Sequence, residues 1–129
     1  MFELTIKDQV YQFNFGMGFM REINKTVTQP VEQIPGQKEN IGLRYKIAAI
    51  MGGDIEALVE VLVAANKYCG GERVTSKLID EYIDDAETDL DKLFKDVMDF
   101  LESANATKKA VAVLKEAAEK QKAKEAANQ

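Results

Sequence analysis

Acidic side chains in the second half of the chain stand at spacings that could hold a cation. Asp85, Glu87 and Asp89 have the spacing of the first three calcium ligands of an EF-hand loop. The sixth position of that loop must be glycine but is Leu90, and the twelfth should be glutamate but is Asp96. We therefore interpret the segment as a solvated acidic turn followed by a helix, whose N-terminal end favours negative charge.

Two pairs of carboxylates could in principle exchange protons with a substrate. Asp80 with Asp84, and Glu81 with Asp85, stand four residues apart, which is one turn of a helix. No apolar or cationic residues cluster with them in the sequence to shift their pKa values. They are interpreted as the exposed face of a helix rather than as an acid–base pair.

A glycine-containing segment after a predicted strand resembles the start of a dinucleotide-binding fingerprint. Gly16 and Gly18 fit the first two glycines, but Arg21 stands where the third is required. The predicted strands also form a hairpin, whereas the fingerprint belongs to a parallel βαβ unit. A turn from strand to helix that needs flexible glycines is the better interpretation.

The types of residue that are missing argue against catalysis. The 129-residue chain has no histidine, which removes the commonest general base and metal ligand. It has one cysteine, Cys69, and two serines, Ser76 and Ser103. Cys69 precedes a Gly-Gly pair on an apolar helix and is interpreted as a small buried hydrophobic residue. We predict no enzyme and no catalytic, cofactor-binding or metal-binding residue, and keep a small hydrolase or metal-binding regulator as a remote alternative.

The charge distribution bears on the kind of partner. The net charge is −5, without the basic surplus of a nucleic-acid-binding protein. Residues 72–104 have 4 basic and 11 acidic side chains, whereas residues 105–129 have 6 basic and 3 acidic ones. No apolar run approaches the ~20 residues that span a membrane, and the N-terminus lacks the pattern of a signal peptide. These features predict a cytoplasmic protein that binds neither nucleic acid nor membranes.

Hydrophobic periodicity predicts an α+β fold that is mainly α. Alternating apolar residues over 2–15 predict a β-hairpin, with a polar connection at Lys7-Asp8-Gln9. Helical spacing predicts a bundle of about five helices against which the hairpin packs. The first helix is expected over 17–27, a loop over 28–38, and a central helix over about 55–69. Asn40, Asp54, Thr75 or Ser76, and Thr88 or Asp89 are the predicted N-caps of the second to fifth helices.

The last part of the chain has a different composition from the rest. Residues 105–129 are rich in alanine, lysine and glutamate, which favour a helix, but they contain little apolar mass. We predict a single domain over 1–104 and a protruding helical tail over 105–129 that frays toward Gln129.

Four hydrophobic residues exceed what one compact core obviously needs. They are Val61, Phe100, Val111 and Leu114. A second layer of the core could use all four. Alternatively they contact another protein, since exposed apolar patches usually mark interfaces.

Four segments in this order resemble one known family. They are FELTIKDQVYQFNFGMGFMREINK (2–25), GDIEALVEVLVAA (53–65), VTSKLIDEYIDD (74–85) and LFKDVMDFLESANATKKAV (93–111). Together they are similar to the tail assembly chaperones of long-tailed phages and prophages of Gram-positive bacteria, over about residues 2–115.

The resemblance implies an assembly factor without catalytic residues. Members of that family hold the tape measure protein, recruit subunits of the major tail tube protein, self-associate, and leave before the tail is finished. Their genes often encode a second, longer product by ribosomal frameshifting. A small structural virion component of the tail or connector is the alternative interpretation.

Overall fold

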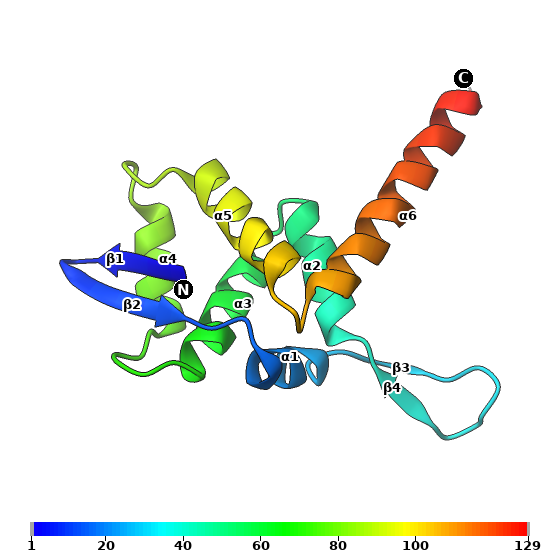
Figure 1. Ribbon diagram of the computed structural model, residues 1–129, viewed down its shortest axis with the longest axis horizontal. Helices are drawn as coiled ribbons and strands as arrows, with labels where there is room; N and C mark the ends of the chain where they lie inside the picture. The colour runs from blue at the N-terminus through cyan, green and yellow to red at the C-terminus, as the bar shows by residue number, and fades with distance from the viewer. Residues whose placement is uncertain (1, 129) are drawn as a thin grey trace.

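A hairpin and six helices form most of the part of the chain that the structure describes. The computed structural model describes residues 2–128 (Figure 1). In order, the elements are β1 (Phe2–Ile6), β2 (Gln9–Phe13), α1 (Met17–Asn24), β3 (Thr28–Pro30), β4 (Lys38–Asn40), α2 (Gly42–Met51), α3 (Ile55–Lys67), α4 (Ser76–Asp84), α5 (Leu90–Ser103) and α6 (Lys108–Ala127). The predicted class, α+β and mainly α, is confirmed.

The N-terminal hairpin is antiparallel and tightly turned. Phe2 pairs with Phe13, and Ile6 pairs with Gln9. Lys7 and Asp8 form the turn with positive φ angles of 52° and 67°, a backbone whose twist matches that of paired strands. Phe2, Ile6 and Phe13 are buried, so one face of the hairpin packs on the helices, as predicted.

Helix α3 is the centre of the core. Six of its apolar side chains are buried: Ala57, Leu58, Val61, Leu62, Ala64 and Ala65. It contacts α1, α2, α4 and β2, so it has neighbours on several sides. This arrangement explains why its apolar stripe is too wide for a surface helix.

The predicted caps of three helices are confirmed. The side chain of Asp54 accepts a hydrogen bond from the backbone N–H of Ala57 at 3.2 Å. Thr75 caps α4 through the N–H of Leu78 at 3.1 Å. Asp89 caps α5 in the same way. These bonds satisfy backbone donors that the first turn of a helix leaves without partners.

The predicted cap of α2 and the end of α1 are wrong. Asn40 is the last residue of β4, and the oxygen Oδ1 of Asn24 instead accepts from the N–H of Leu43 at 3.3 Å. Helix α1 ends at Asn24 rather than near residue 27. There the hydroxyl and the backbone N–H of Thr26 both donate to the carbonyl of Ile23, and the chain turns away.

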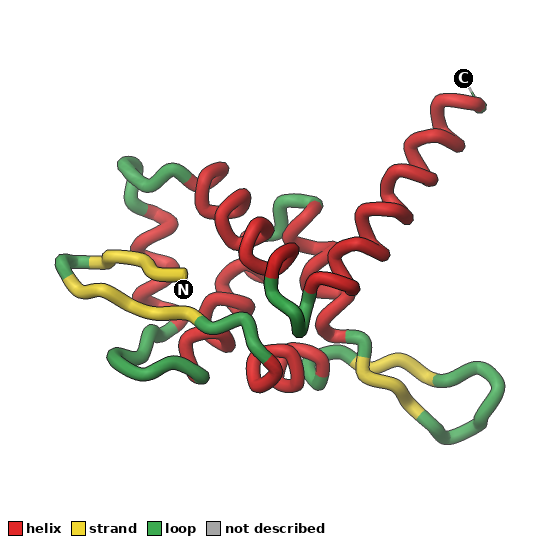
Figure 2. Tube along the Cα trace, in the orientation of Figure 1, coloured by secondary structure: helices red, strands yellow, loops and turns green. Residues whose placement is uncertain are grey.

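A second hairpin replaces the loop predicted over 28–38. Strands β3 and β4 pair from Thr28↔Asn40 to Pro30↔Lys38, and the amide of Gln29 donates to the carboxylate of Glu39 at 2.7 Å. Figure 2 shows the two hairpins at opposite ends of the molecule. All six strand residues are exposed, so this second hairpin is a projecting arm rather than part of the core.

Helix α6 also projects from the body. Only Val111 is buried among its residues, and its first turns pack against α2 and α5. The rest extends outward, away from the N-terminal hairpin (Figure 1). The protruding tail helix is therefore observed up to Ala127, whereas Gln129, toward which fraying is predicted, lies outside the described residues.

Candidate functional site

The four predicted contact residues separate into two pairs. Val61 is 1% exposed and Val111 is 0% exposed, so both belong to the core in this conformation. Phe100 and Leu114 are half-buried. Phe100 lines an open groove, whereas Leu114 lies near the root of α6 and packs against the core.

The groove beside Phe100 has a volume of about 490 Å³. The start of β1, the end of β2, the turn into α1 and the corner between α5 and α6 form its walls. Its lining residues are Phe2, Phe13, Asn14, Phe15, Gly16, Met17, Phe100, Ser103, Ala104, Asn105 and Ala106. We call it the aromatic groove. None of these side chains is charged, so the groove suits an apolar occupant.

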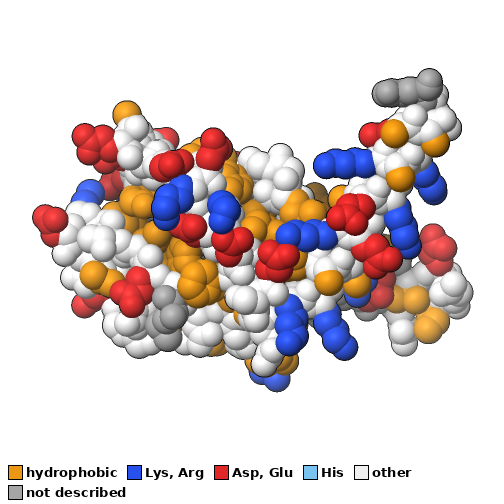
Figure 3. All heavy atoms as spheres, turned by 45° about the horizontal axis from the view of Figure 1, so that its top comes forward, with side chains coloured by type: hydrophobic (Ala, Val, Ile, Leu, Met, Phe, Trp, Pro, Cys, Tyr) orange, Lys and Arg blue, Asp and Glu red, His pale blue; other side chains and the backbone are white. Residues whose placement is uncertain are grey.

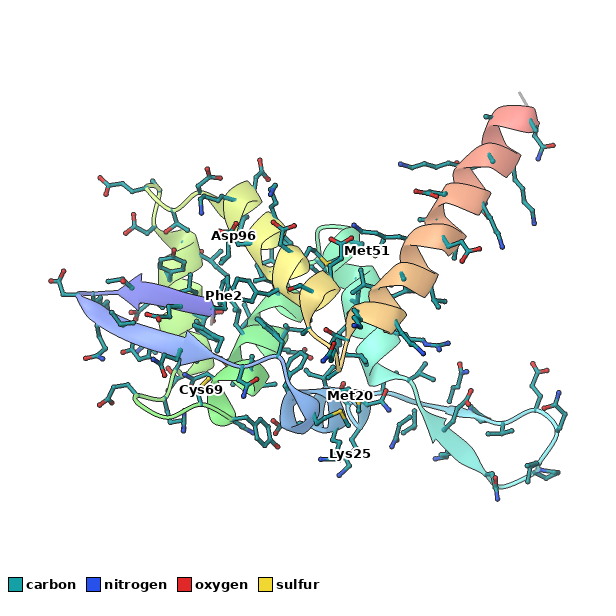
Figure 4. All side chains as sticks on the ribbon, viewed as in Figure 1. Phe2, Met20, Lys25, Met51, Cys69 and Asp96 are labelled. Atoms are coloured by element: carbon teal, nitrogen blue, oxygen red, sulfur yellow. The ribbon has the colours of Figure 1, made fainter. Side chains whose placement is uncertain are left out.

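Phenylalanine rings form the floor of the aromatic groove. The ring of Phe2 lies edge-on to three others, with centroid distances of 5.5 Å to Phe13, 5.9 Å to Phe15 and 5.1 Å to Phe100. Phe2 reaches from β1 toward α5 (Figure 4). Edge-to-face pairs of this kind add specificity and stability beyond the area they bury. The floor is therefore rigid, while Met17 on the rim is 48% exposed.

Two features of the sequence place Phe100 in the groove. The register of the hairpin puts Phe2 opposite Phe13, so both rings lie on the inner face. At the other wall, the buried hydroxyl of Thr107 donates to the carbonyl of Leu101 at 2.5 Å and fixes the corner between α5 and α6. Phe100 lies off the apolar stripe of α5, and this is the signal that identified it in the sequence.

The sequence did not identify the other members of the groove. Phe2, Phe13 and Phe15 were recognised only as the inner face of a hairpin, and Met17 as the start of a helix. Their approach to Phe100 joins residues that lie more than eighty positions apart in the sequence. No local pattern in the sequence signals this approach, because it depends on how the hairpin packs against α5.

Three of the acidic residues singled out by their spacing, Glu81, Asp85 and Asp89, have structural partners. An oxygen of Asp85 accepts from the backbone N–H of Glu87 at 3.0 Å, and Asp89 caps α5. Glu81 pairs with Lys7 at 2.6 Å, and the hydrogen bond from this ammonium holds the pKa of the Glu81 carboxyl below its usual value. Within residues 2–128, no three His, Cys, Asp or Glu side chains group as a metal site would require.

The remaining candidates also have structural explanations. Cys69 is buried, and desolvation raises the pKa of its thiol, while the charge of Arg73 opposes this rise. A raised pKa disfavours the nucleophilic thiolate. A Cβ atom at Gly18 would lie 2.5 Å from the ring of Tyr68, so this glycine leaves room for a ring.

A second groove separates the projecting arm from the root of α6. It has a volume of about 680 Å³ and is lined by Met20, Asn24, Gln29, Glu39, Asn40, Ile41, Leu43, Arg44, Tyr45 and Ala110. Its lining is more polar than that of the aromatic groove. Tyr45 is 56% exposed, more than any other large hydrophobic residue within 2–128.

A small, mainly helical fold with an uncharged aromatic groove is typical of a protein that holds another polypeptide. A family model described as phage tail assembly chaperone protein, TAC, matches residues 3–116. The chain belongs to this family of phage tail assembly chaperones. The family implies a role without catalysis. Comparisons with curated proteins and with solved structures found no match.

The helices were also compared with the length and hydropathy that a bilayer requires. Among residues 2–128, no helix is both long and apolar enough to cross a membrane.

Proposed function

We propose that this protein binds the tape measure protein of a phage tail and recruits subunits of the major tail tube protein to it. It acts in the cytoplasm of the bacterial host and leaves before the tail is complete. Membership in the family of tail assembly chaperones supports this role. The aromatic groove is the observation that carries the proposal, because it offers a site for side chains of a partner.

The chemistry of the groove matches the expected partner. A long helical protein presents apolar side chains in stripes, which aggregate if they stay exposed to water. One such side chain from each repeat of the stripe would enter the groove and pack against Phe100. Each contact is weak alone, but many copies on one partner bind strongly together through multivalency. Weak individual contacts also allow the copies to leave one by one.

The first test is co-purification of Phe100→Ala with the tape measure protein encoded near this gene. We expect at least a ~10-fold loss of affinity, because a central aromatic contact commonly contributes more than 1.4 kcal/mol. The matched control is Tyr45→Ala, which removes an exposed aromatic ring outside the aromatic groove. Unchanged binding by Phe100→Ala would place the partner elsewhere on the molecule.

A second variant separates loss of binding from loss of folding. Met17 is on the rim of the groove and is 48% exposed, so Met17→Glu adds a charge without disturbing the core. We expect it to weaken binding while the thermal unfolding midpoint stays close to that of the wild type. Mass spectrometry of purified virions distinguishes the alternative role, since a structural tail or connector component remains in them and a chaperone does not.

A further inference from the structure

The two strands of the projecting arm turn part of their backbone outward. Near the tip, the N–H of Val31 donates to the carbonyl of Gln37 at 2.9 Å, which makes these two residues a bonded pair. Bonded and non-bonded pairs alternate along antiparallel strands. The next pair toward the body, Pro30↔Lys38, is therefore non-bonded, and the backbone groups of both residues point away from the neighbouring strand.

The same alternation holds at the base of the arm. There the N–H of Ile41 donates to the carbonyl of Val27 at 2.9 Å. The adjacent pair, Thr28↔Asn40, is therefore non-bonded as well. Both strands thus direct backbone groups to their outer edges, and within residues 2–128 no further backbone hydrogen bond reaches the outward groups of β4.

The two outer edges of the arm differ in what they offer a further strand. On β3, Pro30 has no N–H, so that edge lacks one of its donors. On β4, both Lys38 and Asn40 present an N–H and a carbonyl. An unpaired edge of this kind is a template for a strand from another chain. Proline therefore protects the edge of β3, and the edge of β4 is the one that is open to pairing.

A groove lies where β4 reaches the body of the protein. Its lining includes Glu39, Asn40 and Ile41 in succession, and then Arg44 on the first turn of α2. The volume of about 680 Å³ leaves room for side chains of a segment that continues past the end of β4. Figure 3 shows the arm projecting at the end of the molecule from which α6 also extends. A strand added to β4 would therefore run from the projecting arm into this groove.

The charges around this edge favour an acidic partner. Lys38 and Arg44 are both exposed, and neither forms an ion pair within residues 2–128. The carboxylate of Glu39 already accepts from the amide of Gln29 at 2.7 Å, and alternation places it on the other face of the arm from Lys38. A lysine on an edge strand disfavours pairing with a basic strand, whereas opposite charges directly across a sheet stabilise the pair. The added segment should therefore carry acidic side chains.

We propose that the edge of β4 binds an extended, acidic segment of another protein, which adds a strand to the arm. Backbone hydrogen bonds to Lys38 and Asn40 supply affinity, and the charges of Lys38 and Arg44 supply the preference for an acidic sequence. The site goes beyond the proposed function, because the aromatic groove takes apolar side chains whereas this edge takes a main chain. It also gives a role to a hairpin whose strand residues are all exposed.

The test is an NMR titration of the isotope-labelled full chain with a short peptide that alternates threonine and glutamate. The amide signals of Lys38 and Asn40 should move, because their N–H groups gain hydrogen bonds. Lys38→Pro removes one outward donor and should weaken binding about tenfold, the effect of one backbone hydrogen bond. Thr28→Pro is the matched control, since it removes an outward donor from the edge of β3 and should leave binding unchanged.

A charge exchange keeps the test decisive if proline disturbs the arm. The variant Lys38→Glu/Arg44→Glu should lose the glutamate peptide and bind a peptide that alternates threonine and lysine. In every variant, the amide of Val31 reports whether the arm stays paired, because its hydrogen bond joins the two halves of the arm.

Three outcomes overturn the proposal. They are signals of Lys38 and Asn40 that do not move, equal losses with Thr28→Pro and Lys38→Pro, and failure of the charge-exchanged variant to bind the lysine peptide. Signals of Lys38 and Asn40 that move with protein concentration alone would make a second copy the occupant and overturn it too. The peptide tests only this edge, so binding of the tape measure protein by Phe100→Ala decides the proposed function separately.

Discussion

At the scale of single residues, Asn66 links the hairpin, α3 and the segment before α4. Its side chain is 1% exposed. The amide nitrogen Nδ2 donates to the carbonyls of Gln12 and Glu72 at 3.0 Å each, and Oδ1 accepts from the N–H of Val74 at 2.8 Å. A buried amide with all these partners fixes how three segments meet, because losing it leaves the buried N–H of Val74 and two partly buried carbonyls without this partner.

We expect Asn66→Ala to lower the free energy of unfolding by about 1–3 kcal/mol, since it removes the partner of one buried and two partly buried backbone groups. Chemical denaturation followed by circular dichroism measures this change. Gln33→Ala, at an exposed position in the projecting arm, is the control and should change stability by less than about 0.5 kcal/mol. A loss below about 1 kcal/mol for Asn66→Ala would mean that water replaces the amide.

At the scale of elements, the crossing of α1 and α2 depends on Gly42. A Cβ atom there would lie 2.0 Å from the carbonyl oxygen of Ile23 and 2.7 Å from the hydroxyl oxygen of Thr26. The first of these atoms is backbone and cannot rotate away. Both helices border the groove beside the projecting arm, so this close approach also positions the arm relative to α6.

Gly42→Ala should destabilise the fold by about 1–3 kcal/mol, the usual range for overpacking a close contact. Gly70→Ala is the matched control, because a Cβ atom at Gly70 would meet nothing within 4 Å. The control should leave the unfolding midpoint in denaturant nearly unchanged. Equal midpoints for the two variants would show that α1 and α2 separate easily.

At the scale of the whole molecule, the protein combines a packed body with two projections. The body is centred on α3, whereas the arm and residues 115–127 of α6 have no buried side chains. Elements with few buried contacts open with low free energies, because little apolar surface opposes their unfolding. The projections are therefore the parts whose order depends most on a partner.

Hydrogen exchange should reveal this difference directly. We expect amides of residues 115–127 to exchange with little protection, while those of α3 exchange only through global unfolding. Strong protection of residues 115–127 in the isolated protein would contradict this view.

The sequence by itself determined the local structure of this protein. Apolar alternation placed the N-terminal hairpin, and helical spacing placed the helices. Asp54, the pair Thr75 or Ser76, and the pair Thr88 or Asp89 marked three helix starts, because these signals act between residues close in the chain. Hydrophobic periodicity did not predict the arm, because each of its strands has three residues, which are all exposed and form no apolar face. The sequence also did not reveal the cap of α2, because Asn24, whose side chain accepts the hydrogen bond, lies on a different helix, α1.

Only the tertiary structure decided which of the surplus hydrophobic residues are buried and which stay accessible at the surface. In the sequence alone, nothing distinguishes four hydrophobic residues that exceed the needs of one compact core: Val61, Phe100, Val111 and Leu114. Val61 of the central helix α3 is buried, and so is Val111, whose helix packs against α2 and α5. The side chain of Phe100 stays partly exposed beside the ring of Phe2. The aromatic groove brings residues from 2–17 together with residues from 100–106, so no local pattern could contain it. Burial depends on neighbours distant in the chain, and these are fixed only when all the elements pack together.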